Sequence, residues 1–428
     1  MSTFQIIVLG IFGALILIGV GVFASMSGLT GSRDVGPVVM WGTIDEQTMG
    51  AILNAAEKSD PSGILKNVDY EYKDPATYNA VLINSMASGA SPDLFLIRVS
   101  DLQAFSDKII PIPYRSVSQS TFLTSFIDGV EQFLTPQGAL AMPFSVDPLV
   151  MYWNRDMFAS AGVANPPAFW NDFLDLAPKI TSLDNTSPSK QATVALGEWR
   201  NVNHAKEILL TLFMQAGDEV IVRNTNGSPT VVLGASGADS VVRFYTEFAN
   251  PSKTSYSWNR SLPLAQNMFT SGDLAVYFGL MSEANTFTSR NPNLRYGVAP
   301  TPQIEGNVTR FTYGKLTGAA ISRSARNPNG ALAVAQVIGS KGFATAMVLG
   351  TALPPVRRDI SLDTSANAAA AVGMQMALIS RDFLDPNPKE SSSIFQGMVE
   401  SVISGAETPS DAVRDAASGL KSLLSQPF

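Results

Sequence analysis

After Pro37, short apolar runs alternate along the chain with longer segments that show helical periodicity. The apolar runs, each short enough for a β-strand, are residues 38–41, 68–72 and 93–97. The segments between them, which predict helices, are residues 45–58 and 75–88. In the second helix Tyr78, Leu82 and Met86 lie four residues apart and therefore share one face. Strands separated by helices predict βαβ units and a mainly parallel sheet.

The second half of the chain carries further apolar stripes at helical spacing. Apolar residues share one helical face in residues 169–180 and again in residues 205–216. A last helix is predicted to start at Pro409, with Thr408 as its N-cap, and to run to Leu424. These stripes indicate packing against a core and say nothing specific about function.

Residues 4–24 form an apolar run in which Gln5 is the only polar side chain, and the first charged residue of the chain is Arg33. As a helix the run would span about 31 Å, close to the ~30 Å of a bilayer's hydrocarbon core. A cleaved signal peptide has a basic start and a shorter apolar stretch, so we predict an uncleaved transmembrane anchor in residues 1–25. A cleaved signal peptide and a buried core helix are the alternatives. Residues 26–36, which are polar and contain glycine, predict a flexible linker.

The composition allows a large core and excludes several kinds of site. Hydrophobic residues make up 45% of the 428 residues, and this length suffices for more than one domain. The net charge of −7 and the lack of basic runs argue against a nucleic-acid partner. A sequence without cysteine has no disulfide, thiol nucleophile or cysteine-bound metal. His204 is the single histidine, so multi-histidine metal sites are excluded and any Ser-His-Asp triad would have to use this residue.

The sequence contains none of the common catalytic or phosphate-binding motifs. The phosphate loop G-x-x-x-x-G-K-[ST], H-E-x-x-H, G-x-S-x-G and the EF-hand loop are all missing. Ser187 and Lys190 match S-x-x-K, but they lie in a polar loop and no K-T-G follows. His204 lies near the start of a predicted helix, where a partly exposed histidine is commoner than a catalytic base. We therefore predict a protein that is not an enzyme and that uses no metal or cofactor.

Several aromatic residues stand near the ends of predicted elements. They are Trp41, Trp199, Trp258, Tyr277 and Tyr313. Aromatic rings with a few polar groups suit sugars, whose C–H faces stack on rings while their hydroxyls take hydrogen bonds. The alternative for each of these rings is packing inside the protein.

Residues 138–181 carry the most specific motif of the chain, GALAMPFSVDPLVMYWNRDMFASAGVANPPAFWNDFLDLAPKIT. Its landmarks, in order, are Pro143, Asp147, residues 154–158 (NRDMF), Ala161-Gly162, Pro166-Pro167 and residues 170–173 (WNDF). This order and spacing resemble the family-1 extracellular solute-binding proteins, the maltose-binding-like group that serves ABC importers. Trp153 departs from the Tyr that is commoner in that family.

Further segments resemble the same family, and the likeness covers nearly all of residues 37–428. These segments are 87–95 (ASGASPDLF), 214–217 (MQAG), 269–278 (FTSGDLAVYF), 296–302 (YGVAPTP), 313–322 (YGKLTGAAIS) and 353–358 (LPPVRR). The resemblance implies an α/β fold of the two-lobed, periplasmic-binding-protein-like kind (type II), with a hinge and with the ligand in the cleft between the lobes. The expected lobes are an N-lobe of residues 37–145 with 316–353 and a C-lobe of residues 146–315 with 354–428.

By position in that family, the ligand contacts fall at strand ends and near the hinge. With the aromatic residues above, the expected contacts are Trp41, Thr43, Asp45, Arg98, Ser100, Asp147, Trp199, Trp258, Tyr277, Tyr313, Arg357 and Phe395. Asp147, just past the hinge, takes the place of an acceptor for sugar hydroxyls. Met281 stands where relatives often carry a ring, which argues against a maltodextrin. If Arg98, Lys315 and Arg357 converge, an anionic ligand such as a phosphorylated polyol or a uronate is favoured.

The resemblance also implies partners and a location. The expected partners are a sugar, oligosaccharide or polyol, the permease subunits of an ABC transporter, and the membrane through the N-terminal helix. The binding domain would be a monomer on the extracytoplasmic side of the cell membrane. Relatives tethered through a lipid-modified cysteine offer no parallel, because this sequence has no cysteine. A membrane-anchored sensor that signals through lobe closure and a carbohydrate-active enzyme are the alternative functions.

Overall fold

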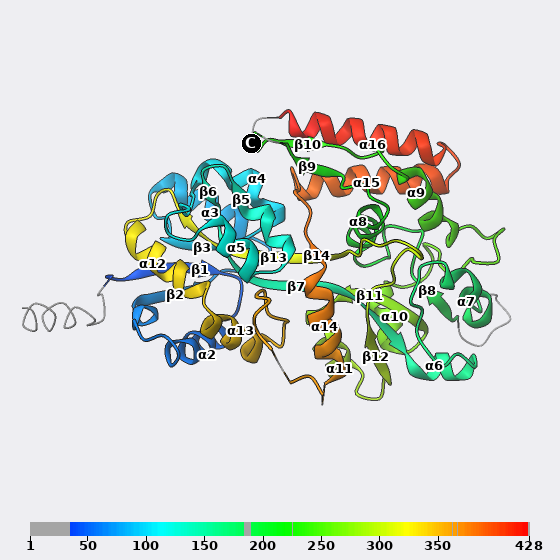
Figure 1. The fold of residues 1–428 in the computed structure, drawn as a ribbon. Coiled ribbons are helices and arrows are strands. Elements are labelled where there is room, and N and C mark those ends of the chain that lie inside the picture. The colour runs from blue at the N-terminus through cyan, green and yellow to red at the C-terminus, as the bar shows by residue number, and fades with distance from the viewer. Residues whose placement is uncertain (1–34, 184–189, 225, 362, 366, 427–428) are drawn as a thin grey trace, which may run out of the picture.

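The computed structural model describes residues 35–426 except 184–189, 225, 362 and 366, and it shows two α/β lobes side by side (Figure 1). The run predicted to form a membrane helix lies outside the described residues. Within them, no single helix is long and apolar enough to cross a membrane. Only one pair of described helices is long and apolar enough when the two are taken together. The pair is α12 (Pro328–Ile338) and α13 (Lys341–Thr351), which are bent by 71° at their junction.

The first lobe begins with the predicted alternation of strands and helices. Its elements up to the first long strand are β1 (Val38–Gly42), α2 (Glu46–Glu57), η2 (Ile64–Asn67), β2 (Val68–Tyr72), α3 (Tyr78–Ser88), β3 (Leu94–Arg98), η3 (Val99–Asp101), α4 (Leu102–Phe105), η4 (Ser106–Lys108), β4 (Ile109–Ile110), α5 (Gln119–Ser125), η5 (Asp128–Phe133), β5 (Leu134–Thr135) and β6 (Gly138–Ala139). Strand β1 is parallel to both β2 and β3, which confirms the predicted βαβ units. Helix α3 starts three residues later than predicted, because Asp74 accepts the backbone N–H of Ala76 and forms a turn there.

The rest of the chain builds the second lobe and returns once to the first, where α12 and α13 lie. Its elements, besides α12 and α13, are β7 (Met142–Asn154), α6 (Arg155–Ser160), α7 (Asp172–Ile180), β8 (Ala192–Val194), α8 (Ala205–Gln215), β9 (Ile221–Arg223), β10 (Pro229–Val231), α9 (Ala238–Glu247), α10 (Ala265–Ser271), β11 (Leu274–Leu280), η6 (Met281–Glu283), α11 (Ala284–Arg290), β12 (Tyr296–Ala299), β13 (Thr312–Ser322), α14 (Ala368–Leu378), β14 (Ser380–Arg381), α15 (Pro388–Ile403) and α16 (Pro409–Leu424). Helices α7, α8 and α16 confirm the three predicted stripes. The predicted cap of α16 is also confirmed, because the Thr408 side chain accepts the backbone N–H of Asp411.

One sheet runs through both lobes in the order β2-β1-β3-β13-β7-β11-β8. Its central pair is β7 and β13, two long antiparallel strands that cross between the lobes (Figure 1). Two separate hydrophobic cores lie along this sheet. On the long strands, Val146 and Leu316 belong to the core of the first lobe, whereas Leu149 and Tyr313 belong to the core of the second. The chain therefore passes between the cores within a few residues on each strand.

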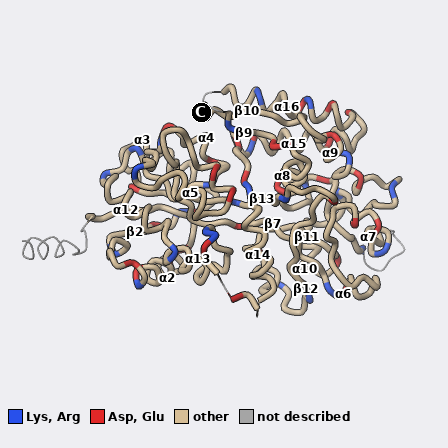
Figure 2. Tube along the Cα trace, in the orientation of Figure 1, with Lys and Arg blue, Asp and Glu red and all other residues tan. Residues whose placement is uncertain are grey.

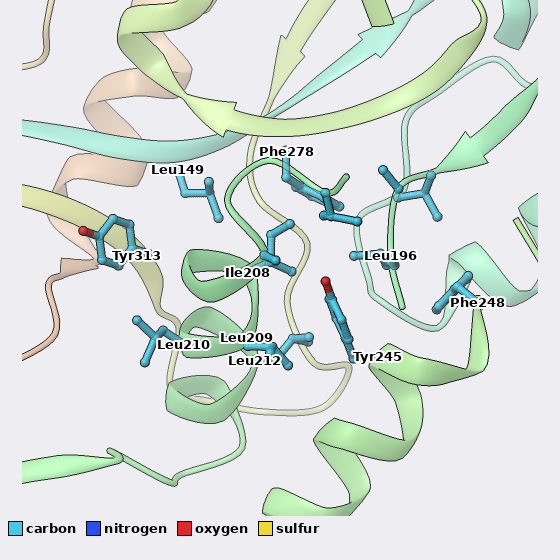
Figure 3. Packing of buried hydrophobic residues seen from close by; sticks show 14 of the residues in the cluster. Leu149, Leu196, Ile208, Leu209, Leu210, Leu212, Tyr245, Phe248, Phe278 and Tyr313 are labelled. Carbon is cyan, nitrogen blue, oxygen red and sulfur yellow. The ribbon is translucent and has the colours of Figure 1, made fainter. Parts of the chain in front are cut away.

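The core of the second lobe is built around α8, which is apolar on more than one face. Ile208, Leu209 and Leu212 of this helix pack among Tyr245, Phe278 and other buried side chains (Figure 3). Burial of this kind is worth about 1.5–3 kcal/mol for each large apolar side chain. It holds α8 and the loop before it against the sheet.

Candidate functional site

Two strands, each parallel to its outer neighbour, end in the middle of the sheet beside the long central strands. Strand β3 ends at Arg98 beside β13, and β11 ends at Leu280 beside Leu149 of β7. Asp147 of β7 and Lys315 of β13 lie opposite each other between those two ends. Open α/β sheets bind ligands at the carboxyl ends of their strands, where the strand order changes. The topology therefore makes the surroundings of Asp147 and Lys315 the candidate ligand site.

Asp147 is a buried carboxylate held by the second lobe. Its Oδ1 accepts the backbone N–H of Ser282 at 3.0 Å, from the turn that follows β11. Burial raises the pKa of Asp147, and the bonds from Ser282 and the charge of Lys315 only partly oppose this. The side chain is thus anchored at the junction of the lobes.

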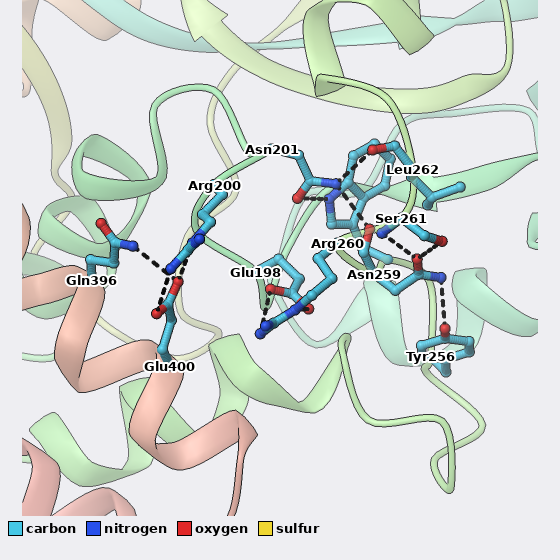
Figure 4. Close-up of polar contacts among 11 residues, drawn as sticks. Glu198, Arg200, Asn201, Tyr256, Asn259, Arg260, Ser261, Leu262, Gln396 and Glu400 are labelled. Atoms are coloured by element: carbon cyan, nitrogen blue, oxygen red, sulfur yellow. Dashed lines mark hydrogen bonds and ion pairs between the residues drawn. The ribbon is translucent and has the colours of Figure 1, made fainter.

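The loop after β8 presents Trp199 with its ring half-buried. Its two neighbours in the sequence are held by ion pairs, Glu198 with Arg260 at 3.3 Å and Arg200 with Glu400 of α15 at 2.8 Å (Figure 4). Because residues on both sides of it are tied to other segments, Trp199 has little freedom to move.

Asn201 completes the attachment of this loop. Its amide nitrogen donates to the carbonyls of Asn259 at 2.9 Å and Leu262 at 3.0 Å, and its oxygen accepts the indole N–H of Trp258 at 3.0 Å (Figure 4). The loop is thus a preformed element, which reduces the entropy that a ligand must overcome on binding.

On the first lobe, the predicted contacts after β1 have other partners in the structure. Trp41 is buried, and the Nζ of Lys73 lies 4.1 Å from the centroid of its ring. The indole N–H of Trp41 has no hydrogen-bond partner among the described residues. Thr43 is half-buried. Asp45 is exposed and caps α2, with its Oδ1 accepting the N–H of Thr48 at 2.9 Å, and this bond lowers its pKa.

The predicted contacts after β3 and on β13 form a second polar group. The guanidinium of Arg98 donates to both carboxylate oxygens of Asp101, at 2.7 and 3.1 Å, and Ser100 between them is half-buried. Tyr313 is buried, and burial together with the neighbouring Asp382 raises the pKa of its hydroxyl well above its ordinary value. Arg98 and Tyr313 therefore each interact with residues of the protein itself, Arg98 with Asp101 and Tyr313 with Asp382.

Three rings that were predicted to contact ligand lie inside the second core, so the prediction is corrected for them. Trp258 and Phe395 are 0% exposed and Tyr277 is 1% exposed. The Phe395 ring packs against Phe213 and Phe383, and the Tyr277 hydroxyl donates to a carboxylate oxygen of the buried turn after β11. Tyr277 lies on a strand and Phe395 on a helix whose buried faces turn toward the core, and Trp258 is held there by its bond to Asn201.

Arg357 also serves the structure of the first lobe. Its guanidinium donates to both oxygens of Asp359, at 2.8 and 2.9 Å, and to the carbonyl of Gly339. It also lies 5.0 Å from the ring centroid of Phe126. Arg357 and Arg98 are thus each paired with a carboxylate, which does not meet the condition of converging free cations that would favour an anionic ligand.

One polar network beside Asp147 was not found from the sequence. His204 and Glu283 contact each other at 2.5 Å although 79 positions separate them. No pattern in the sequence indicates this pairing, because neither residue belongs to a motif.

We also searched the described residues for a cavity lined by predicted contacts and for a group of side chains that could bind a metal ion. A cavity of about 520 Å³ lies in the second lobe among Asn154, Lys179 and Gln191, and none of the predicted contacts lines it. Within the described part of the chain, no three His, Cys, Asp or Glu side chains are grouped so as to hold a metal ion.

Comparison with known proteins bears on this arrangement. The sequence model of a family described as "Bacterial extracellular solute-binding protein" matches residues 43–344. A protein of Brucella abortus (strain 2308) named as a binding protein is 24% identical over 355 residues, which are 80% of this chain and 82% of that protein.

Solved structures share the fold. The cyclic α-maltosyl-1,6-maltose binding protein of Arthrobacter globiformis superposes with a TM-score of 0.75 at 16% identity, over 91% of this chain and 99% of that one. The sugar-binding protein MalE of Xanthomonas citri superposes with a TM-score of 0.72 at 18% identity, over 91% and 97%. These matches confirm the predicted two-lobed α/β fold and the resemblance on which it rested.

Proposed function

Because the chain belongs to the bacterial extracellular solute-binding proteins, we propose that it captures an uncharged carbohydrate and delivers it to the permease of an ABC importer. The observation that carries the proposal is the Asp147 carboxylate at the junction of the lobes, with the firmly held ring of Trp199 in the second lobe as its expected companion. A carboxylate accepts strong hydrogen bonds from sugar hydroxyls, and an indole stacks on the C–H face of a sugar.

The pairing of charges favours a neutral ligand over an anion. Arg98, Arg200 and Arg260 each have a carboxylate partner, and Lys206 is paired with the buried Asp385. Lys315 lies opposite Asp147. An anionic ligand would have to displace one of these carboxylates and lie near Asp147. Along the trace of the described residues, Lys and Arg positions are interspersed with Asp and Glu positions in both lobes (Figure 2).

We propose further that β7 and β13 form the hinge, with the lobes dividing near residues 145/146 and 315/316. Both strands pass from one core to the other close to these positions, between Val146 and Leu149 and between Tyr313 and Leu316. Closure around ligand would then bring Trp199 toward the end of β3, and the closed monomer would dock on the permease.

Replacing Asp147 by alanine is expected to weaken carbohydrate binding by more than tenfold, about 1.5–3 kcal/mol, because hydrogen bonds to a charged acceptor are lost. Trp199→Ala should cost a similar amount through lost stacking area. A panel of maltotetraose, D-tagatose, polyols and glycerophosphodiesters is screened by thermal shift, and the best ligand is measured by calorimetry.

Asp69→Ala serves as the matched control, because Asp69 is an exposed carboxylate in β2 and not at a strand end of the site. Affinity that stays unchanged in both Asp147→Ala and Trp199→Ala would show that the site lies elsewhere. Turnover of a panel sugar would favour the enzyme over the binding protein.

The same proposal includes a membrane anchor formed by residues 4–24. The support is the length of the apolar run and the absence of charge before it. The protein isolated from native membranes is expected to retain this segment, and mass spectrometry of its N-terminal peptide measures this. A mature start between Ser25 and Gly36 would instead identify a cleaved signal peptide.

A further inference from the structure

His204, the only histidine of the chain, sits in a strained position at the start of α8. Its backbone is left-handed, with φ 58° and ψ 27°, a conformation that is unfavourable for a residue with a side chain. The conformation aims the imidazole across to the turn after β11, where Nε2 lies 2.5 Å from Oε1 of Glu283. Strain that persists in a folded protein is held by the contacts around it, and here the contact is with a carboxylate.

Glu283 gathers several donors around the same carboxylate. Oε2 accepts the Tyr277 hydroxyl at 2.7 Å and the Gln266 amide at 2.7 Å, and Oε1 accepts the backbone N–H of Leu280 at 2.9 Å. His204 adds the only cation that contacts Glu283 among the described residues. The carboxylate is therefore fixed, and the imidazole is fixed against it.

This pair connects the two groups on which carbohydrate binding is proposed to depend. On one side, His204 ends the loop that carries Trp199 five positions earlier. On the other side, Glu283 follows Ser282, whose backbone N–H holds Asp147. The loop is also attached through Glu198, Arg200 and Asn201, and Asn203 reaches Glu283 indirectly through Gln266. The His204–Glu283 contact is its direct bond to the turn that positions the Asp147 carboxylate.

We propose that His204 is a positioning residue of the ligand site: through Glu283 it fixes the Trp199 loop relative to Asp147, so that carbohydrate affinity depends on the protonation of this imidazole. The inference rests on the proposed function.

The charges that face His204 favour its protonated form. Burial opposes the charge, but the bond to Glu283 and the charges of Glu207, Glu283 and Asp147 outweigh it and raise the pKa of His204. Glu207 in the first turn of α8 lies 3.9 Å from Nδ1, and the neutral Tyr277 ring packs edge-on against the imidazole. For Glu283, burial alone would raise the pKa, but the bonds from His204 and Tyr277 bring it below its ordinary value.

The raised pKa of His204 and the lowered pKa of Glu283 define the pH range in which both groups are charged. The charged pair exists above the lowered pKa of Glu283 and below the raised pKa of His204. As pH rises through the pKa of His204 in the folded protein, the imidazole loses its charge and its hold on Glu283. Affinity should therefore be highest in the slightly acidic to neutral range and fall on the alkaline side.

Calorimetry on the full chain in mild detergent, with maltotetraose, D-tagatose and acarbose from about pH 5.5 to about pH 9.5, tests the proposal. The wild-type protein should lose affinity as His204 deprotonates. His204→Asn, which tolerates the left-handed backbone, should bind about tenfold more weakly near neutral pH and show no alkaline fall. Glu283→Gln should show the same flat profile. An alkaline fall of the same size and midpoint in all three proteins would overturn the inference.

A second measurement needs no sugar. The single histidine gives one Cε1–H NMR signal, and 5-fluorotryptophan gives one fluorine signal for each of the five tryptophans, with Trp199 assigned from Trp199→Phe. The Trp199 signal should shift with the midpoint of the His204 signal, and it should not titrate in His204→Asn. A Trp199 signal that stays constant while His204 titrates would refute the positioning role. If no sugar binds, the proposed function fails separately, and this result still stands.

Discussion

Replacing Trp258 by alanine is expected to lower the free energy of unfolding by about 3–5 kcal/mol, because a large buried ring would leave a cavity. Trp258 is 0% exposed, and its indole N–H donates to Asn201 at 3.0 Å. The same Asn201 side chain holds Asn259 and Leu262, so the loss would spread into the Trp199 loop (Figure 4). Urea unfolding of the full chain in mild detergent measures the change.

Trp258→Phe and Trp199→Ala are the matched controls. Phenylalanine keeps most of the apolar volume and removes only the hydrogen bond, so its cost should be closer to the ~1–3 kcal/mol of an unpaired buried group. Trp199 is half-buried, and its removal should cost less stability than removal of Trp258 but much more ligand affinity. A loss below about 1 kcal/mol in Trp258→Ala would contradict the core position of this ring.

Asp382 is expected to make the protein less stable as pH rises from about 4 to about 7. Burial of this carboxyl raises its pKa from 3.8 to about 7, although the backbone N–H groups of Phe383 and Leu316 and the charge of Arg98 act in the opposite direction. The folded protein therefore keeps a proton that the unfolded chain releases in this range. Below this pH range Asp382 is protonated in both the folded and the unfolded protein, so it does not change stability with pH. Above the range it is ionised in both, and the folded protein bears the full cost of the buried charge. The shift corresponds to about 4 kcal/mol.

The contribution is isolated by comparing the wild-type protein with Asp382→Asn. The stability of the variant relative to the wild type should rise by up to about 4 kcal/mol between pH 4 and pH 8, whatever constant cost the lost hydrogen bonds add. Urea unfolding at several pH values gives this difference. Asp45→Asn is the control of opposite sign, since the pKa of this exposed cap is lowered. A difference that does not change with pH would mean that Asp382 is already ionised throughout the range.

The corrected ligand contacts show that the sequence pattern did not predict which aromatic rings are buried in the core. Trp199 and Trp258 both stand near element ends in the sequence, and nothing local distinguishes them. In the structure one ring lies half-exposed in a loop and the other lies in the core. Phe395 was expected from its position in the family, but the α15 helix turns it toward Phe213, while Gln396, the next residue, bonds Glu400.

The sequence by itself determined the order of strands and helices, the parallel start of the sheet, and the family. Each of these depends on periodicity or on motifs whose residues are close together, as in residues 138–181. Only the tertiary structure decided which polar groups meet. Arg200 contacts Glu400, Asp147 contacts Ser282, and His204 contacts Glu283 across 200, 135 and 79 positions. Such contacts depend on how distant elements pack together, and the free energy of packing is a property of the whole core, which no local pattern contains.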